Sequence, residues 1–419
     1  MSESSRIATL DAVRGFAVMG ILLLNIVDFA MPGYAYVDPN YYGGATGLNH
    51  AAWTVVYTLF DGKMRGLFTM MFGASTVLIA ERALRSGENP ARVHYARMIS
   101  LFAIGMIHAY FIWYGDILVL YAVCGAIAFL FWRMAPRKLL AIGVILLALK
   151  LVIGTVHYAG SARYEAAASA PGASTALKRD WQAYRDAMAP PPETAADDLK
   201  AYRGSWHDAL VARAKMAFFF QTFLELFSIP DTLALIAIGM ALYRLGFFSG
   251  LWSKQSYRRL AFWSFAIGIP LYAPIVMWID ATRFSPVTLL MTEAIQLSIL
   301  RPFLSLAWAA LVILFMQSGS ARWLADRLAA AGRMAFSNYL GTSIVCTTLF
   351  NGYGFGWYGY LQRWQCYIVV ALVWALILLW SKPWLDRFAY GPFEWLWRSL
   401  ARMKIQPFRR TRPLATDSQ

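Results

Sequence analysis

The chain lacks the residues on which several classes of protein depend. Only three of its 419 residues are cysteines (Cys124, Cys346 and Cys366), and no pair has the spacing of a zinc-binding or redox motif. It contains no glycine-rich phosphate-binding motif, no Gly-x-Ser-x-Gly nucleophile motif and no His/Cys cluster with metal-ligand spacing. We therefore expect no metal site, no permanently bound cofactor and no nucleotide hydrolysis, and we interpret the cysteines as buried apolar residues.

Charged residues are also scarce. They make up 15% of the chain and hydrophobic residues 59%, against about 25% and about 45–50% in typical soluble domains. A soluble fold of this composition would have too little polar surface. Apolar runs recur from residue 16 to residue 380. This pattern predicts one polytopic membrane unit.

Ten apolar segments are long enough to cross a bilayer, at about 20 residues per crossing. The fold predicted is therefore all-α, a bundle of about ten transmembrane helices formed by residues 1–400, followed by a basic tail at 401–419. The predicted spans lie near 9–31, 64–83, 96–114, 116–133, 139–158, 216–244, 260–280, 289–316, 334–352 and 364–382.

The net charge of +15 has two interpretations. In a soluble protein, 38 Lys and Arg against 23 Asp and Glu would suggest nucleic acid as a partner. In a membrane protein the excess reflects the cationic bias of cytoplasmic loops. If the N-terminus is cytoplasmic, 24 of the 38 cations fall on the inner side. We therefore predict that both termini are cytoplasmic, and that nucleic acid is not a partner.

One long extracytoplasmic insertion is predicted at residues 159–215. Leu199, Tyr202, Trp206 and Leu210 follow helical spacing, which predicts an amphipathic helix on the membrane or capping the bundle. The insertion could be a mere connector with a short surface helix, or it could be a lid or an acceptor-binding element.

A second outer segment, roughly residues 32–63, combines glycine, proline and charge close to membrane depth. Such residues are unfavourable in lipid and are tolerated where the backbone lines a cavity or is buried in protein. The segment contains His50 and ends at Lys63. We expect a site here, with Lys63 in its polar network.

Polar residues within the first span are the next candidates, because ionisable groups at membrane depth are rare and often functional. Asp11 and Arg14 are three residues apart and can form an ion pair on one helix face. Asn25 lies deeper, and its amide could either hold another helix or orient a reacting group. Asp28 follows one turn later and is assigned to the polar network.

His108 is the second candidate imidazole, since histidine is suited to proton transfer near neutral pH. Asp116 follows eight residues later, but Gly115 is expected to break the helix, so that Asp116 caps the next span. For His108, an interhelical hydrogen bond and a catalytic role remain equally open.

Two prolines mark a third polar region. Pro230 precedes Asp231, and Pro302 follows Arg301, so both could open a polar cavity in the bundle. A buried Arg301 needs an anion. Glu293, Asp231 or the pyrophosphate of a coenzyme A could supply it.

Several sequence blocks resemble the YeiB-like bacterial inner-membrane proteins, a family of unknown function. The blocks span almost the whole chain, except for the outer insertion. They are Thr9–Ala17 (TLDAVRGFA), Gly20–Asn25, Gly62-Lys63, Leu67-Phe68, Phe72-Gly73, Gly105–His108, Gly115–Leu118, Gly332–Ala335, Asn338–Leu340 and Gly391–Arg398. The resemblance implies a multi-pass protein of the bacterial inner membrane.

The Asp-x-x-Arg-Gly opening also resembles a wider group of transmembrane acyltransferases that includes the heparan glucosaminide acetyltransferases. In those enzymes an asparagine late in the first span and a histidine in a His-Ala-x-Trp run form the catalytic pair. Asn25 and the run from His50 to Trp53 match this pattern. The resemblance implies these two as catalytic residues, with His108 as the substitute base.

This resemblance implies transfer of an acyl group from cytoplasmic acyl-coenzyme A to a hydroxyl or amine on the outer side, in an envelope sugar, a lipid or a small amine. Arg14, Arg301 and Arg333 would then meet the phosphates of the donor. A transporter of a small solute is the alternative, and a structural or sensor protein is a third. Besides the lipid bilayer, a second copy of the chain in a homodimer is the one macromolecular partner we consider.

Overall fold

The computed structural model describes residues 3–409, and every regular element in that range is a helix. This confirms the all-α prediction. The α-helices are α1 (Glu3–Ala30), α2 (Gly47–Leu59), α3 (Lys63–Arg85), α4 (Pro90–Ile107), α5 (Leu118–Ala128), α6 (Pro136–Ser169), α7 (Thr175–Met188), α8 (Ala195–Arg203), α9 (Trp206–Phe219), α10 (Glu225–Arg244), α11 (Lys254–Ala281), α12 (Pro286–Ile295), α13 (Arg301–Ser318), α14 (Arg322–Arg333), α15 (Ala335–Phe350), α16 (Arg363–Arg387) and α17 (Pro392–Ala401).

Shorter helical turns interrupt these elements. The 3-10 turns are η1 (Gly33–Tyr36), η3 (Phe129–Phe131) and η4 (Pro192–Thr194). The π-helical turns are η2 (His108–Ile112), η5 (Phe220–Leu224) and η6 (Gln296–Leu300). Each π-helical turn joins directly onto an α-helix, and such turns are frequent at functional sites.

Eight helical segments within residues 3–409 are long and apolar enough to cross a membrane, which makes the chain a multi-pass membrane protein. They are Ala8–Ala30, Gly47–Arg85, Pro90–Ile112, Pro136–Ser169, Leu226–Arg244, Lys254–Ala281, Pro286–Ser318 and Arg363–Arg387. The other two predicted spans fall on shorter helices, Leu118–Phe131 and α15. The count of ten spans therefore stays a prediction.

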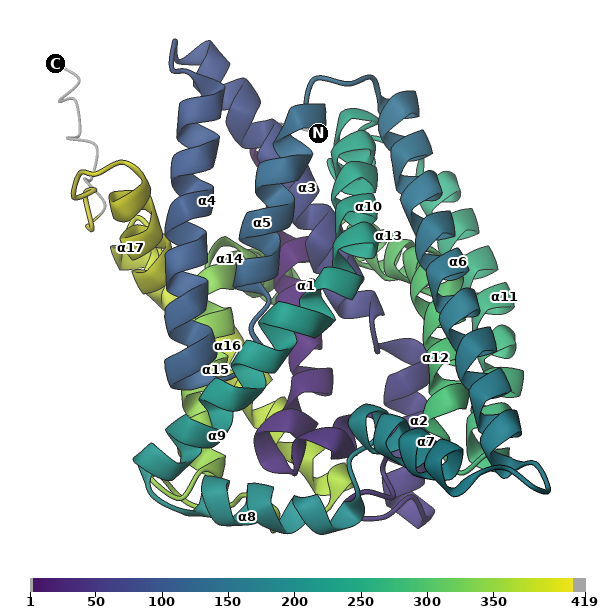
Figure 1. Ribbon diagram of the computed structural model, residues 1–419. Coiled ribbons are helices and arrows are strands. Elements are labelled where there is room, and N and C mark those ends of the chain that lie inside the picture. Colours follow the sequence, from purple (N-terminus) through teal and green to yellow (C-terminus); the bar gives the residue numbers. More distant parts are fainter. Residues whose placement is uncertain (1–2, 410–419) are drawn as a thin grey trace, which may run out of the picture.

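Helix α1 is the centre of the bundle (Figure 1). It packs against α3, α13, α14, α15 and α16, and most of its side chains from Leu10 onward are buried. Helices α6 and α11 lie at the periphery and expose apolar side chains, including Val144, Ile145 and Val156 on α6. An exposed apolar face of this kind suits contact with lipid.

The basic connections meet at one end of the bundle. Arg244 donates hydrogen bonds of 2.5 Å to the carbonyl oxygens of Trp132 and Met134, and Arg402 pairs with Glu88 at 3.5 Å. Helices α2, α7 and α8 lie at the opposite end (Figure 1). The loops that the sequence assigns to the cytoplasm thus share one end, whichever compartment that end faces.

The insertion at 159–215 is mostly helical. Helix α6 continues to Ser169, and α7, α8 and the start of α9 follow. Leu199, Tyr202, Trp206 and Leu210 do not lie on one helix, because the chain breaks at Gly204 between α8 and α9. Ser205 and Asp208 form a capping box that starts α9, and this pairing of a side chain with the free backbone N–H groups favours a new helix start.

Close contacts between helices depend on glycine. A Cβ atom at Gly239 of α10 would lie 2.0 Å from the carbonyl oxygen of Met70, and one at Gly73 of α3 would lie 2.1 Å from that of Ile236. Small residues let transmembrane helix backbones approach closely. The contact between α3 and α10 therefore requires both glycines.

Replacing Gly239 with alanine tests this requirement. We expect G239A to lower the free energy of unfolding by about 1–3 kcal/mol, because the added methyl group overlaps backbone that cannot move aside. Gly341→Ala on α15 is the matched control, since a Cβ atom there meets nothing within 4 Å. Unfolding in detergent measures both, and equal stability of the two variants would contradict the packing argument.

Candidate functional site

His108 and Asp116 form a buried pair where α4 ends. The His108 Nδ1–H donates to Asp116 Oδ1 at 2.8 Å, and both side chains are 1% exposed. The other carboxylate oxygen of Asp116 accepts the Val119 backbone N–H at 2.9 Å, near the start of α5. Asp116 therefore accepts a backbone N–H at the start of α5, as expected of a capping residue, and it also holds the imidazole.

The second nitrogen of His108 is free. Nε2 is buried and has no hydrogen-bond partner among residues 3–409. The ring lies beside Tyr339 and Trp113, with centroids 5.3 and 6.3 Å away. An imidazole with one nitrogen fixed by a carboxylate and the other unpaired has the arrangement of a general base.

His50 forms a second, more accessible pair with a carboxylate. Its Nε2 lies 3.0 Å from Asp280 Oδ1 on α11, and the two side chains are 32% and 37% exposed. Asn25 on α1 is half-buried, and its side chain makes no hydrogen bond to His50 or to any other residue in the described part of the chain. The two residues that match the acyltransferase pattern are thus not a hydrogen-bonded pair here.

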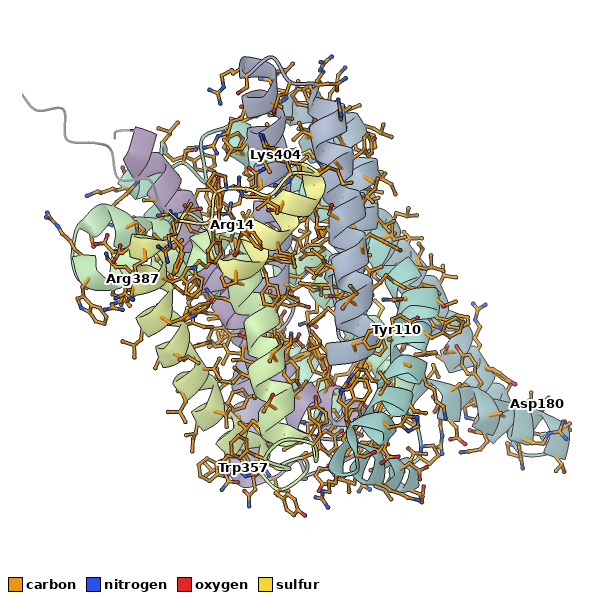
Figure 2. All side chains as sticks on the ribbon, turned by 90° about the vertical axis from the view of Figure 1, so that its left-hand side faces the viewer. Arg14, Tyr110, Asp180, Trp357, Arg387 and Lys404 are labelled. Atoms are coloured by element: carbon orange, nitrogen blue, oxygen red, sulfur yellow. The ribbon has the colours of Figure 1, made fainter. Side chains whose placement is uncertain are left out.

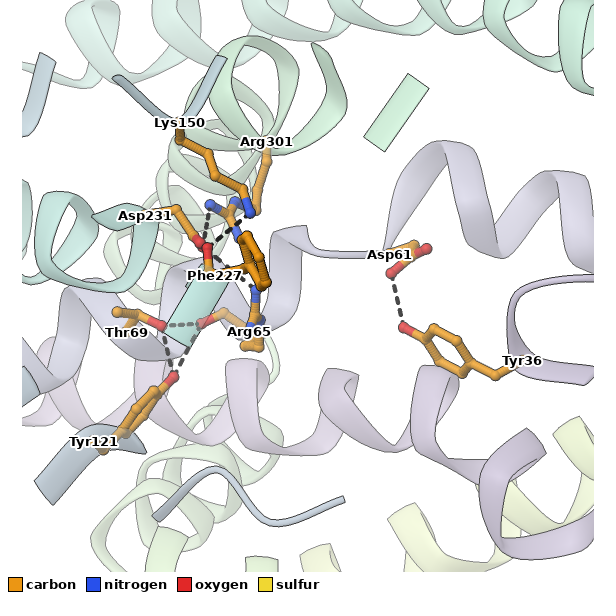
Figure 3. A network of polar contacts seen from close by, with 9 residues as sticks. All are labelled: Tyr36, Asp61, Arg65, Thr69, Tyr121, Lys150, Phe227, Asp231 and Arg301. Carbon is orange, nitrogen blue, oxygen red and sulfur yellow. Dashed lines mark hydrogen bonds and ion pairs between the residues drawn. The ribbon is translucent and has the colours of Figure 1, made fainter. Parts of the chain in front are cut away.

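Asp231 joins two arginines in the centre of the bundle (Figure 3). Its Oδ2 accepts hydrogen bonds from Arg301 at 2.8 Å and from Arg65 at 3.4 Å. Arg301 and Asp231 are 0% and 1% exposed. Of the anions considered for Arg301, Asp231 is the one that pairs with it, whereas Glu293 on α12 is exposed and forms no ion pair within residues 3–409.

A chain of hydrogen bonds connects this cluster to α5. Thr69 donates to the Arg65 carbonyl oxygen at 2.8 Å and lies 2.6 Å from the Tyr121 hydroxyl. Tyr121 lies five residues after Asp116. The first turns of α5 therefore contact both the buried histidine pair and the buried arginines.

Lys63 is fully buried at the start of α3. Its ammonium donates to the Tyr57 carbonyl oxygen at 2.6 Å and lies 4.0 Å from the centre of the Tyr272 ring. The hydroxyl of Tyr36 donates to Asp61 at 3.1 Å nearby (Figure 3). Lys63 is thus held by a carbonyl and an aromatic face.

The arginines expected to bind phosphate do not share a partner. Arg14 pairs with Asp11 at 2.9 Å, as the spacing suggested, and donates to Ser75 of α3 at 2.9 Å. Arg333 is exposed at the end of α14. Because Arg301 is buried with Asp231, the three arginines expected to meet phosphate do not form one cluster.

Two narrow pockets open into the bundle. The first, between α1 and α2, is lined by residues that include Asp61, Tyr57 and Arg363. The second, which we call the α9 pocket, is lined by Asp28, Phe29, Ile112, Trp113, Tyr114, Tyr202, Arg213, Thr347, Asn351 and Tyr358. Both have room for a water-sized group, and neither has room for a sugar ring as it stands.

Helix α8 covers the loop that follows α1, at the end of the bundle opposite the basic connections (Figure 1). Asp198 accepts the Gly33 backbone N–H at 3.2 Å. Burial raises the pKa of Asp198, while this hydrogen bond acts in the opposite direction. The insertion at 159–215 is therefore fixed to the bundle by α8.

Sequence reasoning missed Arg65, Arg213 and Tyr202. Arg65 lies near the end of a predicted span, where an arginine is expected to extend its guanidinium to the membrane surface. Arg213 and Tyr202 lie in the insertion at 159–215. The π-helical turns before Arg301 and at His108 were also missed. Proline next to Arg301 was the one local signal of irregular backbone there.

Comparison with known proteins divides the chain into two parts. Residues 6–166, which contain His50, His108 and Asp116, match the family model described as heparan-alpha-glucosaminide N-acetyltransferase, catalytic. Residues 242–404, which contain Arg301, match the family model described as protein of unknown function (DUF418).

Full-length relatives are known from bacteria. The uncharacterized protein YeiB of Escherichia coli (strain K12) is 31% identical over 96% of this chain and 98% of its own length. The uncharacterized protein YxaH of Bacillus subtilis (strain 168) is 28% identical over 96% of each chain. An uncharacterized 39.9 kDa protein of Bacillus acidopullulyticus is 23% identical over 94% of this chain and 93% of its own length. No solved structure matches.

The buried ion pair gives a testable prediction for stability. We expect Asp231→Asn to lower the free energy of unfolding by about 3–5 kcal/mol, because it leaves the Arg301 charge buried without a counter-ion. The double variant Asp231→Leu/Arg301→Leu should recover most of this loss, since it removes both charges. Denaturant-induced unfolding in detergent measures all three proteins.

The exposed pair of Lys382 and Asp386, at 3.4 Å, provides the matched control. Asp386→Asn should change the free energy of unfolding by less than about 1 kcal/mol, as exposed ion pairs contribute little. If Asp231→Asn and Asp386→Asn lowered the free energy of unfolding equally, the buried pair would contribute no more to stability than an exposed one.

Proposed function

This chain belongs to the family of YeiB and YxaH, and from that membership and the arrangement of its buried residues we propose that it is a transmembrane acyltransferase. The observation that carries the proposal is the buried pair of His108 and Asp116, with a free Nε2. The pair lies in the part of the chain that matches the heparan-alpha-glucosaminide N-acetyltransferase catalytic model.

In the proposed reaction, His108 Nε2 takes a proton from a hydroxyl or amine of the acceptor. The oxygen or nitrogen attacks the carbonyl carbon of an acyl thioester, with acyl-coenzyme A as donor. The new C–O or C–N bond forms while the C–S bond breaks, and the departing thiolate receives the proton from His108. Asp116 stabilises the imidazolium and keeps Nδ1 protonated, so that Nε2 is the basic nitrogen.

The proposal assigns different tasks to the other polar residues. Arg333 is exposed at the basic end, and Arg14 is partly exposed there, so both can meet the phosphates of the donor. Arg301 has no exposed surface and is paired with Asp231, which supports a structural task. Asn25 is half-buried on α1 and its side chain makes no hydrogen bond to another described residue, so it can orient the acceptor or the thioester carbonyl.

His108 is preferred to His50 because it is enclosed. An imidazole in a water-excluded site can transfer a proton without competition from solvent, whereas the pair of His50 and Asp280 is about one-third exposed. His50 remains the second candidate base.

Label transfer from radiolabelled acetyl-coenzyme A tests the assignment. With purified full-length protein and an extract of candidate acceptors, His108→Ala should lower the transfer rate by about 10²–10⁴-fold. Asp116→Asn should lower it at least tenfold, through loss of the carboxylate that fixes the tautomer. His50→Ala should stay within twofold of the parent protein.

His207→Ala is the matched control, because His207 is exposed on α9. Loss of transfer in His50→Ala but not in His108→Ala would reassign the base to His50. No transfer by the parent protein, together with no thermal stabilisation by coenzyme A, would reject the acyltransferase proposal.

We also propose ten spans in a bacterial inner membrane, with both termini in the cytoplasm. The support is the shared end of the basic connections and the positive-inside rule. In Figure 2, Lys404 and Asp180 stand toward opposite ends of the molecule. They would face the cytoplasm and the outer side, respectively.

Single cysteines test this orientation. A membrane-impermeant maleimide should label Asp180→Cys in intact cells whose outer membrane is permeable to the reagent. It should label Lys404→Cys only after the inner membrane is opened. The three native cysteines are buried and give little background. The reverse labelling pattern would invert the proposed topology.

A transporter of a small solute is the second candidate, and the cluster of Asp231, Arg65 and Arg301 favours it. Arg301 directly follows the π-helical turn η6, and irregular helices with charge at depth are also found at transport sites. Counterflow of labelled solute in proteoliposomes, without acyl transfer, would support this candidate.

A further inference from the structure

Helix α17 is fixed to the edge of the bundle, against α4 and α15 (Figure 1). The indole Nε1 of Trp397 donates to the Arg97 carbonyl oxygen on α4 at 2.9 Å. Glu394 accepts the backbone N–H groups of Phe336 and Ser337, at 2.8 and 3.1 Å, where α15 begins. The rings of Phe336 and Trp397 also lie in contact, with centroids 5.2 Å apart. These contacts fix which face of α17 points toward the protein.

The chain after α17 forms a loop that is held to the helix. The Lys404 backbone N–H donates to the Ser399 carbonyl oxygen at 3.1 Å, and the Gln406 N–H donates to the Ser399 hydroxyl at 3.1 Å. The indole of Trp395 donates to the Gln406 carbonyl oxygen at 2.8 Å. We call the helix and this loop, residues 392–409, the α17 unit. Its hydrogen bonds hold the tip of the loop in a defined shape.

The tip of this loop presents apolar side chains outward. Met403 and Ile405 are 91% and 78% exposed, and no other large apolar side chain among the described residues is more exposed. Leu396 and Leu400 of α17 are also exposed. Contact of such side chains with water is unfavourable, and a contiguous apolar patch indicates a surface that another phase or partner covers.

Cations occupy the opposite face of α17. Leu396 and Leu400 are four residues apart and share one face, and Arg398 and Arg402 share another in the same way. At about 100° per residue, Leu396 and Arg398 stand about 200° apart around the helix axis. Both arginines are exposed. An apolar face opposite an arginine face is typical of a helix that lies in the membrane–water boundary.

The positive charge of the α17 unit is not neutralised by the protein. The unit contains four Lys or Arg and one acid, Glu394, which is already bonded to α15. Arg398 lies 4.5 Å from the centre of the Tyr390 ring and forms no ion pair within residues 3–409. Arg402 has one partner, Glu88, at 3.5 Å, and that pair is exposed. The unit therefore suits a negatively charged surface.

The level of α17 along α4 agrees with a place among the headgroups. Helix α4 carries Arg92 and Arg97 in its first half and no charged residue after Arg97. Ile99 and Phe102, which follow, are exposed. Trp397 bonds to α4 at Arg97, where this change from charged to apolar surface occurs. Tryptophan is favoured at this boundary, because its ring is apolar and its N–H is polar.

We propose that the α17 unit is an interfacial anchor that binds phospholipids with a net negative headgroup. Met403 and Ile405 enter the acyl-chain region, and Arg398 and Arg402 bind the headgroup phosphates. A Lys or Arg near an anionic lipid surface strengthens binding by about fivefold. An anionic lipid is therefore preferred to a zwitterionic one. The inference does not depend on the acyltransferase proposal.

A fluorophore at the tip of the loop tests the insertion. Met403→Cys in the full-length protein is labelled with an environment-sensitive dye and reconstituted in nanodiscs of phosphatidylglycerol and phosphatidylcholine. Lipids brominated on the acyl chain should quench this dye, whereas a dye on Asp180→Cys, exposed on α7, should keep its intensity. The native cysteines are buried and give little background. An unquenched dye at Met403→Cys would overturn the proposal and leave the loop free for a soluble partner.

The preference for headgroup charge is measured in nanodiscs that contain equal amounts of the two lipids, with only one of them brominated. Brominated phosphatidylglycerol should quench the Met403→Cys dye about threefold more than brominated phosphatidylcholine, or better. In the Arg398→Gln/Arg402→Gln background this ratio should fall toward one. Equal quenching by the two lipids in the parent background would overturn the proposal.

Arg258→Gln/Arg259→Gln is the matched control, because it removes the same charge from exposed positions of α11. This variant should keep the preference for phosphatidylglycerol. Thermal unfolding of each labelled protein shows whether it is folded. An unchanged ratio in folded Arg398→Gln/Arg402→Gln, or an equal loss in the control, would overturn the assignment to the α17 unit.

Discussion

The carboxylate of Asp231, held between Arg65 and Arg301, is the interaction on which the centre of the bundle depends. It joins α10 to α3 and α13 in a place where Arg301 has no contact with water. Charges at membrane depth are stable only when paired or directed to a cavity. The same constraint explains why His108 lies against Asp116 and Lys63 against a carbonyl oxygen.

The π-helical turns show how the helices meet this constraint. A π-helical turn widens the helix and shifts the side chains that follow it relative to a regular α-helix. One such turn begins at His108, one ends just before Arg301, and one ends at Leu224, seven residues before Asp231. Irregular backbone at this depth is tolerated because it is enclosed by protein. Local irregularity and buried charge therefore occur together.

Hydropathy predicted most of the fold, because each span carries its own apolar signal. Ion pairs between residues close in sequence could also be predicted. The pair of Asp11 and Arg14, three residues apart, is present. Pairings across helices were harder. Asp231 was one of several candidates for Arg301, and nothing in the sequence placed Arg65 beside them or Arg213 in a pocket. Such contacts depend on the three-dimensional packing of helices, which local sequence patterns do not contain.

The location of His108 limits how a donor and an acceptor can meet. Helix α4 starts at the basic end and has 18 residues before His108, which at about 1.5 Å per residue is about 27 Å. The hydrocarbon core of a bilayer is about 30 Å thick. The length of α4 before His108 is thus close to that thickness. In the proposed reaction, a donor that enters at the basic end places its acyl group along most of this length, so a thioester on a long flexible arm suits the proposal better than a compact donor does.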